Sequence, residues 1–214
     1  GTRIAAMIAL GEKEMDPIAL PPASETHLDI VRLTFHNEDT EIERAMKYAR
    51  CLMYKGYDVC MQPVGTTSYS SMELLKLIDQ INTLNPYAFY LVDTLGMLYK
   101  HDLLKMIYLI DSNLNENVAV GFHSHNNLQT SFSNVQEILA FQSQRQFIVD
   151  GSVFGMGRGA GNLCTEIIMD YINKSYEDRY DILPLLEIID ECLSSIYAEN
   201  PWGYSAAYFL SAAK

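Results

Sequence analysis

The chain has 214 residues, of which 49% are hydrophobic and 20% charged. This composition is typical of one soluble globular domain and excludes disordered and fibrous proteins. The net charge of −12 argues against nucleic acid as a partner, because affinity for a polyanion comes mainly from clustered lysine and arginine side chains, and the sequence has no such cluster.

The sequence also indicates where in the cell the protein is located. Its apolar runs are shorter than the roughly 18 residues that a membrane-spanning helix needs, and its first residues lack the pattern of a signal peptide. We therefore expect a cytoplasmic protein that does not engage a membrane. The four cysteines form no CxxC pair, so we expect reduced thiols buried in the core. They are Cys51, Cys60, Cys164 and Cys192.

Predicted strands alternate with predicted helices along the chain. The strands begin about 30 residues apart, which is the length of one βα unit. We predict strands at residues 3–10, 28–35, 57–64, 87–94, 118–125 and 147–154. Apolar spacing and capping residues predict helices at 40–54, 71–84, 100–114, 128–141, 164–174 and 182–197. The segment 11–27 carries three prolines, and we expect a loop there with one short helix.

This alternation predicts an α/β fold with parallel strands, either a TIM (β/α)8 barrel or a doubly wound open sheet of the flavodoxin type. A nucleotide-binding open sheet would carry a glycine-rich loop after its first strand, and the sequence there, MIALGEKE, has none. The barrel is therefore favoured. Six βα units are two short of eight, so we expect residues 1–214 to form a single, incomplete barrel domain. Because such a barrel exposes two sheet edges, we expect a homo-oligomer or a partner protein to cover them.

The sharpest candidate site lies at the end of the fifth predicted strand, in VAVGFHSHNN. Side chains alternate across a strand, so His123 and His125 share a side with Ala119 and Gly121. Two neutral imidazoles at a strand end are suitable ligands for a divalent metal, and two histidines in ordinary hydrogen bonds are the alternative. Active sites of barrels and open sheets lie at the carboxyl ends of strands, which favours the metal site.

Five glycines follow in the segment VDGSVFGMGRGAGNLCTE. Glycine allows positive φ angles and close approach of a ligand to backbone amides, and the next helix would direct its first N–H groups to the same place. We predict that Gly157, Gly159 and Gly161 form a floor that binds a carboxylate or phosphate of the substrate, although a tight turn would need the same glycines. Arg158 adds a charge-assisted contact to this floor or is a solvated loop residue.

The motifs VGFHSHNNLQTSFSN and FIVDGSVFGMGRGAGNLCTE resemble the end of the barrel in DRE-TIM metallolyases, the superfamily of the 4-hydroxy-2-oxovalerate aldolases and hydroxymethylglutaryl-CoA lyases. The segments DIVRLTFHNED, GYDVCMQPVG and AFYLVDTLGML resemble its middle strands. The first predicted strand resembles the family's third. The Asp-Arg-Glu or Arg-Asp-Gly motif of the family's first strand is not in this sequence. We therefore expect the first two βα units to precede this segment, unless the chain is a homologue that has lost the chemistry.

The resemblance implies cleavage of a carbon–carbon bond in a small 2-oxo acid or related acyl substrate, with a divalent metal as cofactor. Manganese or magnesium suits an oxygen-rich ligand shell, and zinc suits the two nitrogens. The resemblance also implies that His123 and His125 bind the metal and that Asn162 lies at the same site. A barrel that binds metal or carboxylate for a partner protein without cleaving bonds is the alternative function.

Three further residues are candidates for catalysis. Arg32 shares a strand face with Ile30 and Thr34 and is expected to point into the barrel, where a buried arginine needs a carboxylate such as Asp93. This pair is either catalytic or a structural ion pair. His36 follows the second predicted strand and is expected to reach the substrate pocket.

Overall fold

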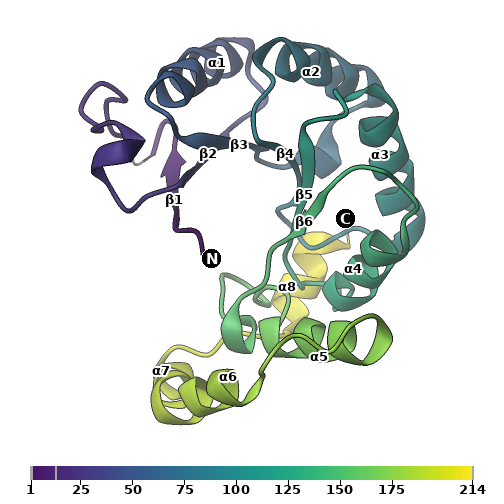
Figure 1. Cartoon of the computed structure of the whole chain (residues 1–214). Helices are drawn as coiled ribbons and strands as arrows, with labels where there is room; N and C mark the ends of the chain where they lie inside the picture. The colour runs from purple at the N-terminus through teal and green to yellow at the C-terminus, as the bar shows by residue number, and fades with distance from the viewer. Residues whose placement is uncertain (1, 13, 214) are drawn as a thin grey trace. The chain divides into compact units, whose positions relative to one another are not determined.

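Six strands form one sheet in the order β1-β2-β3-β4-β5-β6 in the computed structural model, which describes residues 2–12 and 14–213 (Figure 1). The strands are β1 (Ala5–Ala9), β2 (Ile30–Phe35), β3 (Asp58–Pro63), β4 (Ala88–Asp93), β5 (Ala119–Ser124) and β6 (Phe147–Val149). Each strand lies beside its neighbour in sequence, whereas a doubly wound sheet would reverse its order partway. The parallel strands, the alternating helices and the sheet that does not close confirm the incomplete barrel.

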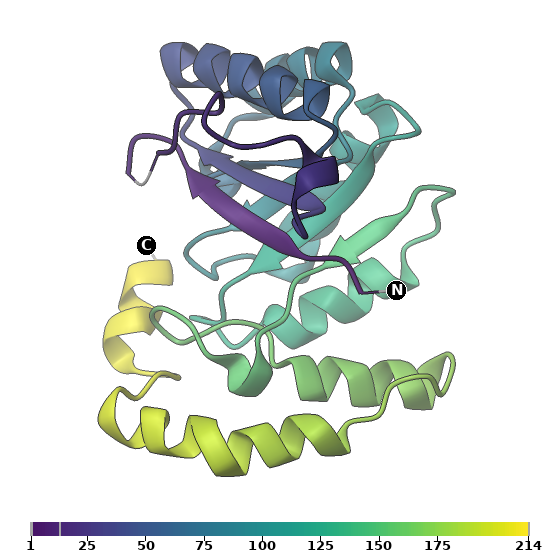
Figure 2. The same cartoon turned by 60° about the vertical axis from the view of Figure 1, so that its left-hand side comes forward.

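Eight α-helices are seen in the described part of the chain. They are α1 (Asp39–Tyr54), α2 (Ser71–Leu84), α3 (Lys100–Asn113), α4 (Ser131–Ala140), α5 (Thr165–Ser175), α6 (Leu183–Ile188), α7 (Ser194–Glu199) and α8 (Ala206–Ala212). A π-helical turn, Ile189–Leu193, joins α6 to α7, so that the helix predicted at 182–197 is continuous (Figure 2). A short 3₁₀ helix, Ala23–Glu25, lies in the first long connection, as predicted.

Contacts divide the chain into two compact units. The first contains the chain up to Val92, Leu104–Phe122 and Gln142–Ile148. The second contains Asp93–Leu103, His123–Phe141 and the chain from Val149 onward. All the residues of the candidate metal site described below belong to the second unit.

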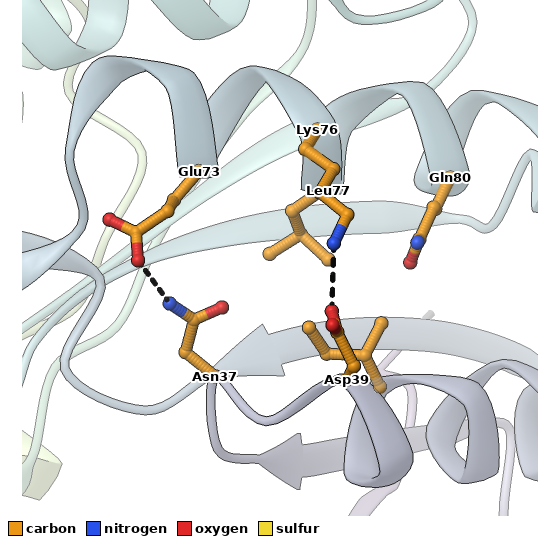
Figure 3. A pocket seen from close by; sticks show the side chains of 7 residues that line it. Asn37, Asp39, Glu73, Lys76, Leu77 and Gln80 are labelled. Carbon is orange, nitrogen blue, oxygen red and sulfur yellow. Dashed lines mark hydrogen bonds and ion pairs between the residues drawn. The ribbon is translucent and has the colours of Figure 1, made fainter.

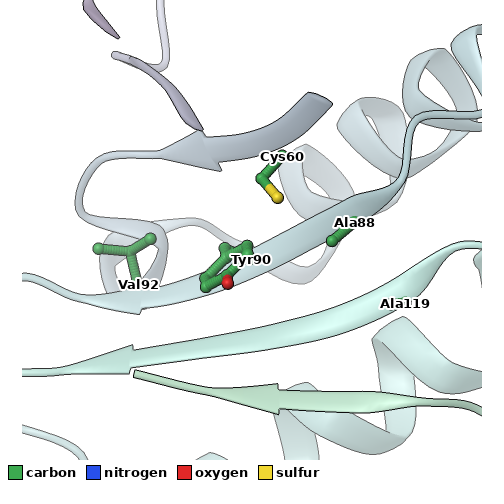
Figure 4. Packing of buried hydrophobic residues seen from close by; sticks show 5 residues of the cluster. All are labelled: Cys60, Ala88, Tyr90, Val92 and Ala119. Atoms are coloured by element: carbon green, nitrogen blue, oxygen red, sulfur yellow. The ribbon is translucent and has the colours of Figure 1, made fainter. Parts of the chain in front are cut away.

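The core of the first unit has two faces. On one face, Val31, Leu33 and Phe35 of β2 are fully buried, and α1 packs on β2 and β3. On the other face, small and medium side chains of three strands form a compact cluster, shown in Figure 4: Cys60, Ala88, Tyr90, Val92 and Ala119. Gly121 borders this cluster, and a Cβ atom there would lie 2.4 Å from the Tyr90 ring. The absence of a side chain at Gly121 therefore makes room for Tyr90.

Arg145 joins the end of α3 to the start of β5 in the first unit. Its guanidinium group is almost fully buried and bonds the Asp111 carboxylate at 2.9 Å. It also donates to the backbone carbonyls of Asn115, Val118 and Leu114. Because one charged group satisfies carbonyls from the end of α3 and the start of β5, this arginine fixes the connection between them.

Two predicted boundaries were wrong. The strand predicted at 147–154 ends at Val149, because the chain then leaves the sheet to meet the start of α5, where Ser152 N donates to Leu163 O at 2.9 Å. The helix predicted at 128–141 begins only at Ser131. Gln129 has a φ of 59°, which interrupts the helix, and the Asn126 side chain accepts the Ser131 amide at 3.2 Å.

The cysteines are free thiols, as predicted, but their expected burial is only partly correct. Cys60 is buried, Cys51 and Cys164 are half-buried, and Cys192 is exposed on the π-helical turn. Within residues 2–12 and 14–213, no helix is long and apolar enough to cross a membrane.

Candidate metal site

The two histidines predicted as metal ligands lie together at the end of β5. His123 belongs to the strand, and His125 follows it directly. Their rings are 5.2 Å apart between centroids and nearly perpendicular, with an interplanar angle of 87°. Strand alternation therefore brings the two imidazoles to one side, as the sequence predicted.

A carboxylate that the sequence analysis did not select orients the first of these rings. Asp150, one residue beyond β6, lies with Oδ2 2.9 Å from Nδ1 of His123. The Asp150 side chain is only 13% exposed, so water screens the contact weakly. With Nδ1 held by the carboxylate, Nε2 of His123 is the nitrogen that can bind a metal.

The surroundings of His125 favour the neutral imidazole that metal binding requires. Burial lowers the pKa of its imidazole, and the neighbouring His123 lowers it further, while hydrogen bonds with the backbone of Arg158 and Gly161 raise it. The His125 backbone amide donates to the Asp93 carbonyl at 3.2 Å.

Asn162 is joined to His125 by a short backbone bridge. Its backbone pairs with that of His125 in an antiparallel β-bridge. Its amide nitrogen donates to the Met156 carbonyl at 2.9 Å, whereas its Oδ1 is buried and finds no hydrogen-bond partner in the described part of the chain. A Cβ atom at Gly157 would lie 2.4 Å from the Asn162 side chain, so this glycine is needed to seat it. A buried amide oxygen without a partner, on a residue whose backbone pairs with His125, fits a divalent metal ligand.

The glycine loop, residues 151–161, is folded tightly on itself. Gly155, Gly159 and Gly161 have φ angles of 60°, 66° and 82°, and a Cβ atom on Gly161 would lie 2.2 Å from the Gly155 carbonyl oxygen. The amides of Ala160 and Gly161 already donate within the chain, to Asn127 Oδ1 and to the Arg158 carbonyl. The candidates for a substrate contact within the predicted anion-binding floor are therefore the amides at residues 157–159.

Two residues directly after the histidine motif support this loop, and neither was selected from the sequence. The Asn126 amide donates to the Gly161 carbonyl at 2.9 Å, and Asn127 Oδ1 accepts the Ala160 amide at 3.1 Å. Asn127 is nearly fully buried. The asparagines of the HSHNN motif thus attach the glycine loop to the end of β5. The signal in the sequence was their position directly after the two histidines.

The three predicted catalytic residues lie in different surroundings. Asp93 ends β4 and is fully buried, and its two oxygens accept the amides of Met97 and Leu98 at 2.9 and 3.0 Å. Burial raises the pKa of its carboxyl group, and these amides oppose the shift. Arg32 and His36 belong to the first unit.

In that unit, the Arg32 guanidinium lies 5.0 Å from the centroid of the Tyr90 ring, a cation–π distance. His36 is exposed after β2, with Nδ1 3.3 Å from Glu41 Oε1. The structure therefore brings together His123, His125, Asn162 and the glycine loop, and it gives Arg32 and His36 local partners of their own.

A third acidic or histidine ligand is not part of this arrangement. Among residues 2–12 and 14–213, no group of three His, Cys, Asp or Glu side chains could hold a metal ion. The site that the described residues form is two imidazoles with an asparagine oxygen, which leaves coordination positions for other ligands.

A separate hollow lies over α1 and α2 in the first unit (Figure 3). Its polar side chains bond one another: Lys76 contacts Asp39 at 2.8 Å and Asn37 contacts Glu73 at 3.4 Å. Asp39, Glu73 and Lys76 lie on the two helices, and Asn37 lies between β2 and α1. Lys76 and Asp39 are largely exposed. We therefore assign no chemistry to this hollow.

The strand order and the paired strand-end histidines define a barrel of the DRE-TIM type. The model of the HMGL-like family matches residues 18–190, and the chain belongs to that family. The resemblance inferred from the two late motifs is thereby confirmed.

Curated relatives are similar to this chain over most of its length. A 4-hydroxy-2-oxovalerate aldolase from Bacillus thuringiensis is 28% identical over 182 residues, which is 83% of this chain and 50% of the relative. An oxaloacetate decarboxylase from Mycobacterium tuberculosis is 28% identical over 165 residues, 77% of this chain and 47% of the relative. The chain thus spans about half the length of the curated relatives it matches.

Solved structures show the same fold. The N-terminal domain of an aldolase candidate from Bacteroides vulgatus superposes with a TM-score of 0.79 at 25% identity, over 99% of this chain and 68% of that one. The hydroxymethylglutaryl-CoA lyase of Pseudomonas aeruginosa superposes with a TM-score of 0.72 at 16% identity, over 100% of this chain and 75% of that one.

Proposed function

We propose that this chain supplies the barrel of a divalent-metal-dependent lyase that cleaves a carbon–carbon bond in a 2-oxo acid or related acyl substrate. The observation that carries the proposal is the cluster at the end of β5, where His123 is oriented by Asp150 and the backbone of His125 pairs with that of Asn162. Oδ1 of Asn162 is buried and has no hydrogen-bond partner among the described residues. The names of the family and its relatives, aldolases, lyases and a decarboxylase, support this class of reaction.

The metal would be held by His123, His125 and Asn162, with manganese or magnesium as the first choice and zinc as the second. Bound there, it would act as a Lewis acid on the substrate's oxo group and stabilise the enolate charge that bond cleavage leaves behind. The protein's own contribution is to fix the ligands. Asp150 sets the orientation of His123, burial lowers the pKa of His125, and Gly157 leaves the space that Asn162 occupies.

The substrate's carboxylate would bind to the glycine loop. The amides of Gly157 and Gly159 and the exposed Arg158 side chain supply hydrogen-bond donors, Arg158 with a positive charge, and Gly161 allows the tight fold that aligns them. These donors would orient the substrate so that its oxo group meets the metal.

Arg32, His36 and Asp93 are the further residues that we propose for catalysis. A guanidinium group is suited to neutralise developing negative charge, and an imidazole is suited to transfer a proton near neutral pH. Asp93 would act as a positioning residue, because its carboxylate fixes the turn at residues 96–98 and its carbonyl accepts the His125 amide.

The test is an assay for pyruvate release, coupled to NADH oxidation by lactate dehydrogenase. The protein is expressed from its whole reading frame and supplied with Mn²⁺ and either a 4-hydroxy-2-oxo acid or oxaloacetate. We expect pyruvate from one of these substrates, a loss of more than a hundredfold in His123→Ala, and normal rates in His101→Ala, an exposed histidine outside the site. Equal rates in the two variants would refute the proposed site.

The second candidate function is a barrel that binds a metal or carboxylate for a partner protein without cleaving bonds. The observation that favours it is that the described residues contain no third acidic or histidine ligand. Mn²⁺ binding without turnover of either substrate would select this function.

We further propose that another copy of the chain or a partner protein covers the edge of the sheet, and that the protein works in the cytoplasm, where its free thiols stay reduced. β1 is the first strand in the sheet order, and Met7 within it and Ile4 just before it are more than half exposed. Unpaired strand edges with apolar side chains favour association. A monomer at micromolar concentration in size-exclusion chromatography would contradict this proposal.

A further inference from the structure

The C-terminal segment, residues 202–211, lies against the glycine loop within the second unit. The indole N–H of Trp202 donates to the Phe154 carbonyl at 2.9 Å, and the Gly203 amide approaches the Gly159 carbonyl at 3.5 Å. A Cβ atom on Gly159 would lie 3.6 Å from the Tyr208 ring. The segment therefore meets the loop both near its beginning and near its end.

Trp202 is the centre of a three-ring cluster. Its ring is edge-on to Phe154 at 5.6 Å and to Tyr197 at 4.9 Å, with interplanar angles of 79° and 84°. Phe154 and Tyr197 are themselves 5.3 Å apart. Edge-to-face contacts of this kind fix relative orientation better than aliphatic packing does. The cluster thus holds Phe154 of the glycine loop against Tyr197 at the end of α7.

One residue of the loop, Phe154, is held in a strained conformation by contacts from outside the loop. Phe154 has a φ of 58°, a left-handed conformation that a bulky side chain adopts only when its surroundings enforce it. Its amide donates to Glu166 Oε2 at 3.0 Å, and its carbonyl accepts from Trp202. Both polar groups of this strained residue are therefore bound by side chains outside the loop.

Trp202 also reaches the part of the loop that carries the proposed metal ligand. A Cβ atom on Gly161 would lie 3.2 Å from Cδ1 of Trp202. Gly161 immediately precedes Asn162, and the Asn162 amide donates to the carbonyl of Gly155, the residue after Phe154. The indole thus packs at the place where the two ends of the loop meet, next to Asn162.

We propose that Trp202 is a positioning residue that holds the glycine loop in the conformation that presents Asn162 to the metal. The effect on metal affinity rests on the proposed function, whereas the effect on loop order does not. Indole supplies both contacts at once, a hydrogen bond to the strained turn and a flat surface against Gly161. A phenylalanine at this position would lose the hydrogen bond and keep only part of the ring surface against Gly161.

The test uses trypsin, because Arg158 lies exposed in the middle of the loop. Cleavage after Arg158 gives fragments 1–158 and 159–214, whose appearance is followed by mass spectrometry in the absence of metal. The variants are Trp202→Phe and Trp202→Ala, and the control is Leu210→Ala, an exposed apolar residue of the same segment. Mn²⁺ affinity is then measured for each by isothermal titration.

We expect cleavage after Arg158 to be at least about tenfold faster in Trp202→Ala than in the control, because the rate follows the population of the opened loop. Trp202→Phe loses one hydrogen bond and is expected to be cut about fivefold faster. Cleavage at the control rate in both variants overturns the proposal. If circular dichroism shows that Trp202→Ala does not fold, the test rests on Trp202→Phe. In that case, cleavage of Trp202→Phe after Arg158 at the control rate overturns the proposal.

The measurement of Mn²⁺ affinity separates the effect of Trp202 on loop order from its effect on metal binding. We expect Mn²⁺ binding at least about tenfold weaker in Trp202→Ala than in the control. Unchanged affinity beside faster cleavage would overturn the link between Trp202 and Asn162. If the unmodified chain binds no Mn²⁺, the proposed function fails, while faster cleavage in the variants still supports the role of Trp202 in ordering the loop.

Discussion

Replacing Asp150 tests whether the carboxylate behind His123 prepares a metal ligand. Asp150→Asn keeps a hydrogen-bond acceptor for Nδ1 of His123 but removes the charge, whereas Asp150→Ala removes both. Replacing a partner of this kind weakens metal affinity about 10- to 100-fold, which is about 1.4 to 2.7 kcal/mol. Because the Asp150 side chain is only 13% exposed, little of this effect is screened.

We therefore expect Mn²⁺ to bind about 10-fold more weakly to Asp150→Asn and about 100-fold more weakly to Asp150→Ala, measured by isothermal titration at neutral pH. The matched control is Asp79→Asn, an exposed carboxylate on α2, which should leave affinity unchanged. The reasoning is refuted if Asp150→Ala binds as tightly as this control, or if the asparagine variant is the weaker of the two.

Three further predictions concern pH, stability and reactivity. Burial lowers the pKa of His125, so its contribution to stability is present above about pH 6.5 and is lost as the pH falls through the lowered pKa. The urea concentration at the midpoint of unfolding should consequently fall more between pH 7.5 and 5 in the unmodified chain than in His125→Gln. Equal decreases in the two proteins would contradict this role of His125. Arg145→Ala should lower the free energy of unfolding by about 3–5 kcal/mol in urea titrations, because it leaves Asp111 and several carbonyls unpaired, and a loss below about 1 kcal/mol would show that the network is dispensable. Burial raises the pKa of the Cys164 thiol to about 11, so iodoacetamide at pH 8 should alkylate the exposed Cys192 first, and faster modification of Cys164 by mass spectrometry would refute its burial.

The strand-end histidines could be predicted because they depend only on local order. Alternation along one strand places His123 and His125 on the same side, and parallel strands place their carboxyl ends at one edge. The helix at Ser71–Leu84 was equally readable, since Ser70 and Glu73 form a capping box within four residues. Features of this kind need no knowledge of distant contacts.

Asp150 and Trp202 could not be predicted in the same way, because their roles depend on residues far away in the sequence. Asp150 meets His123 across 27 positions, and Trp202 meets Phe154 across 48. The sixth strand was predicted too long for the same reason. Its apolar pattern continues to Phe154, but contacts with the start of α5 draw the chain out of the sheet after Val149.

The most direct test of the central claim is Mn²⁺ binding by isothermal titration, with pyruvate present at neutral pH. The unmodified chain is compared with the double variant His123→Ala, His125→Ala and with His101→Ala. We predict binding of one ion by the unmodified chain and by His101→Ala, and none by the double variant. Equal binding by all three, or binding by none, would contradict a metal site at the end of β5.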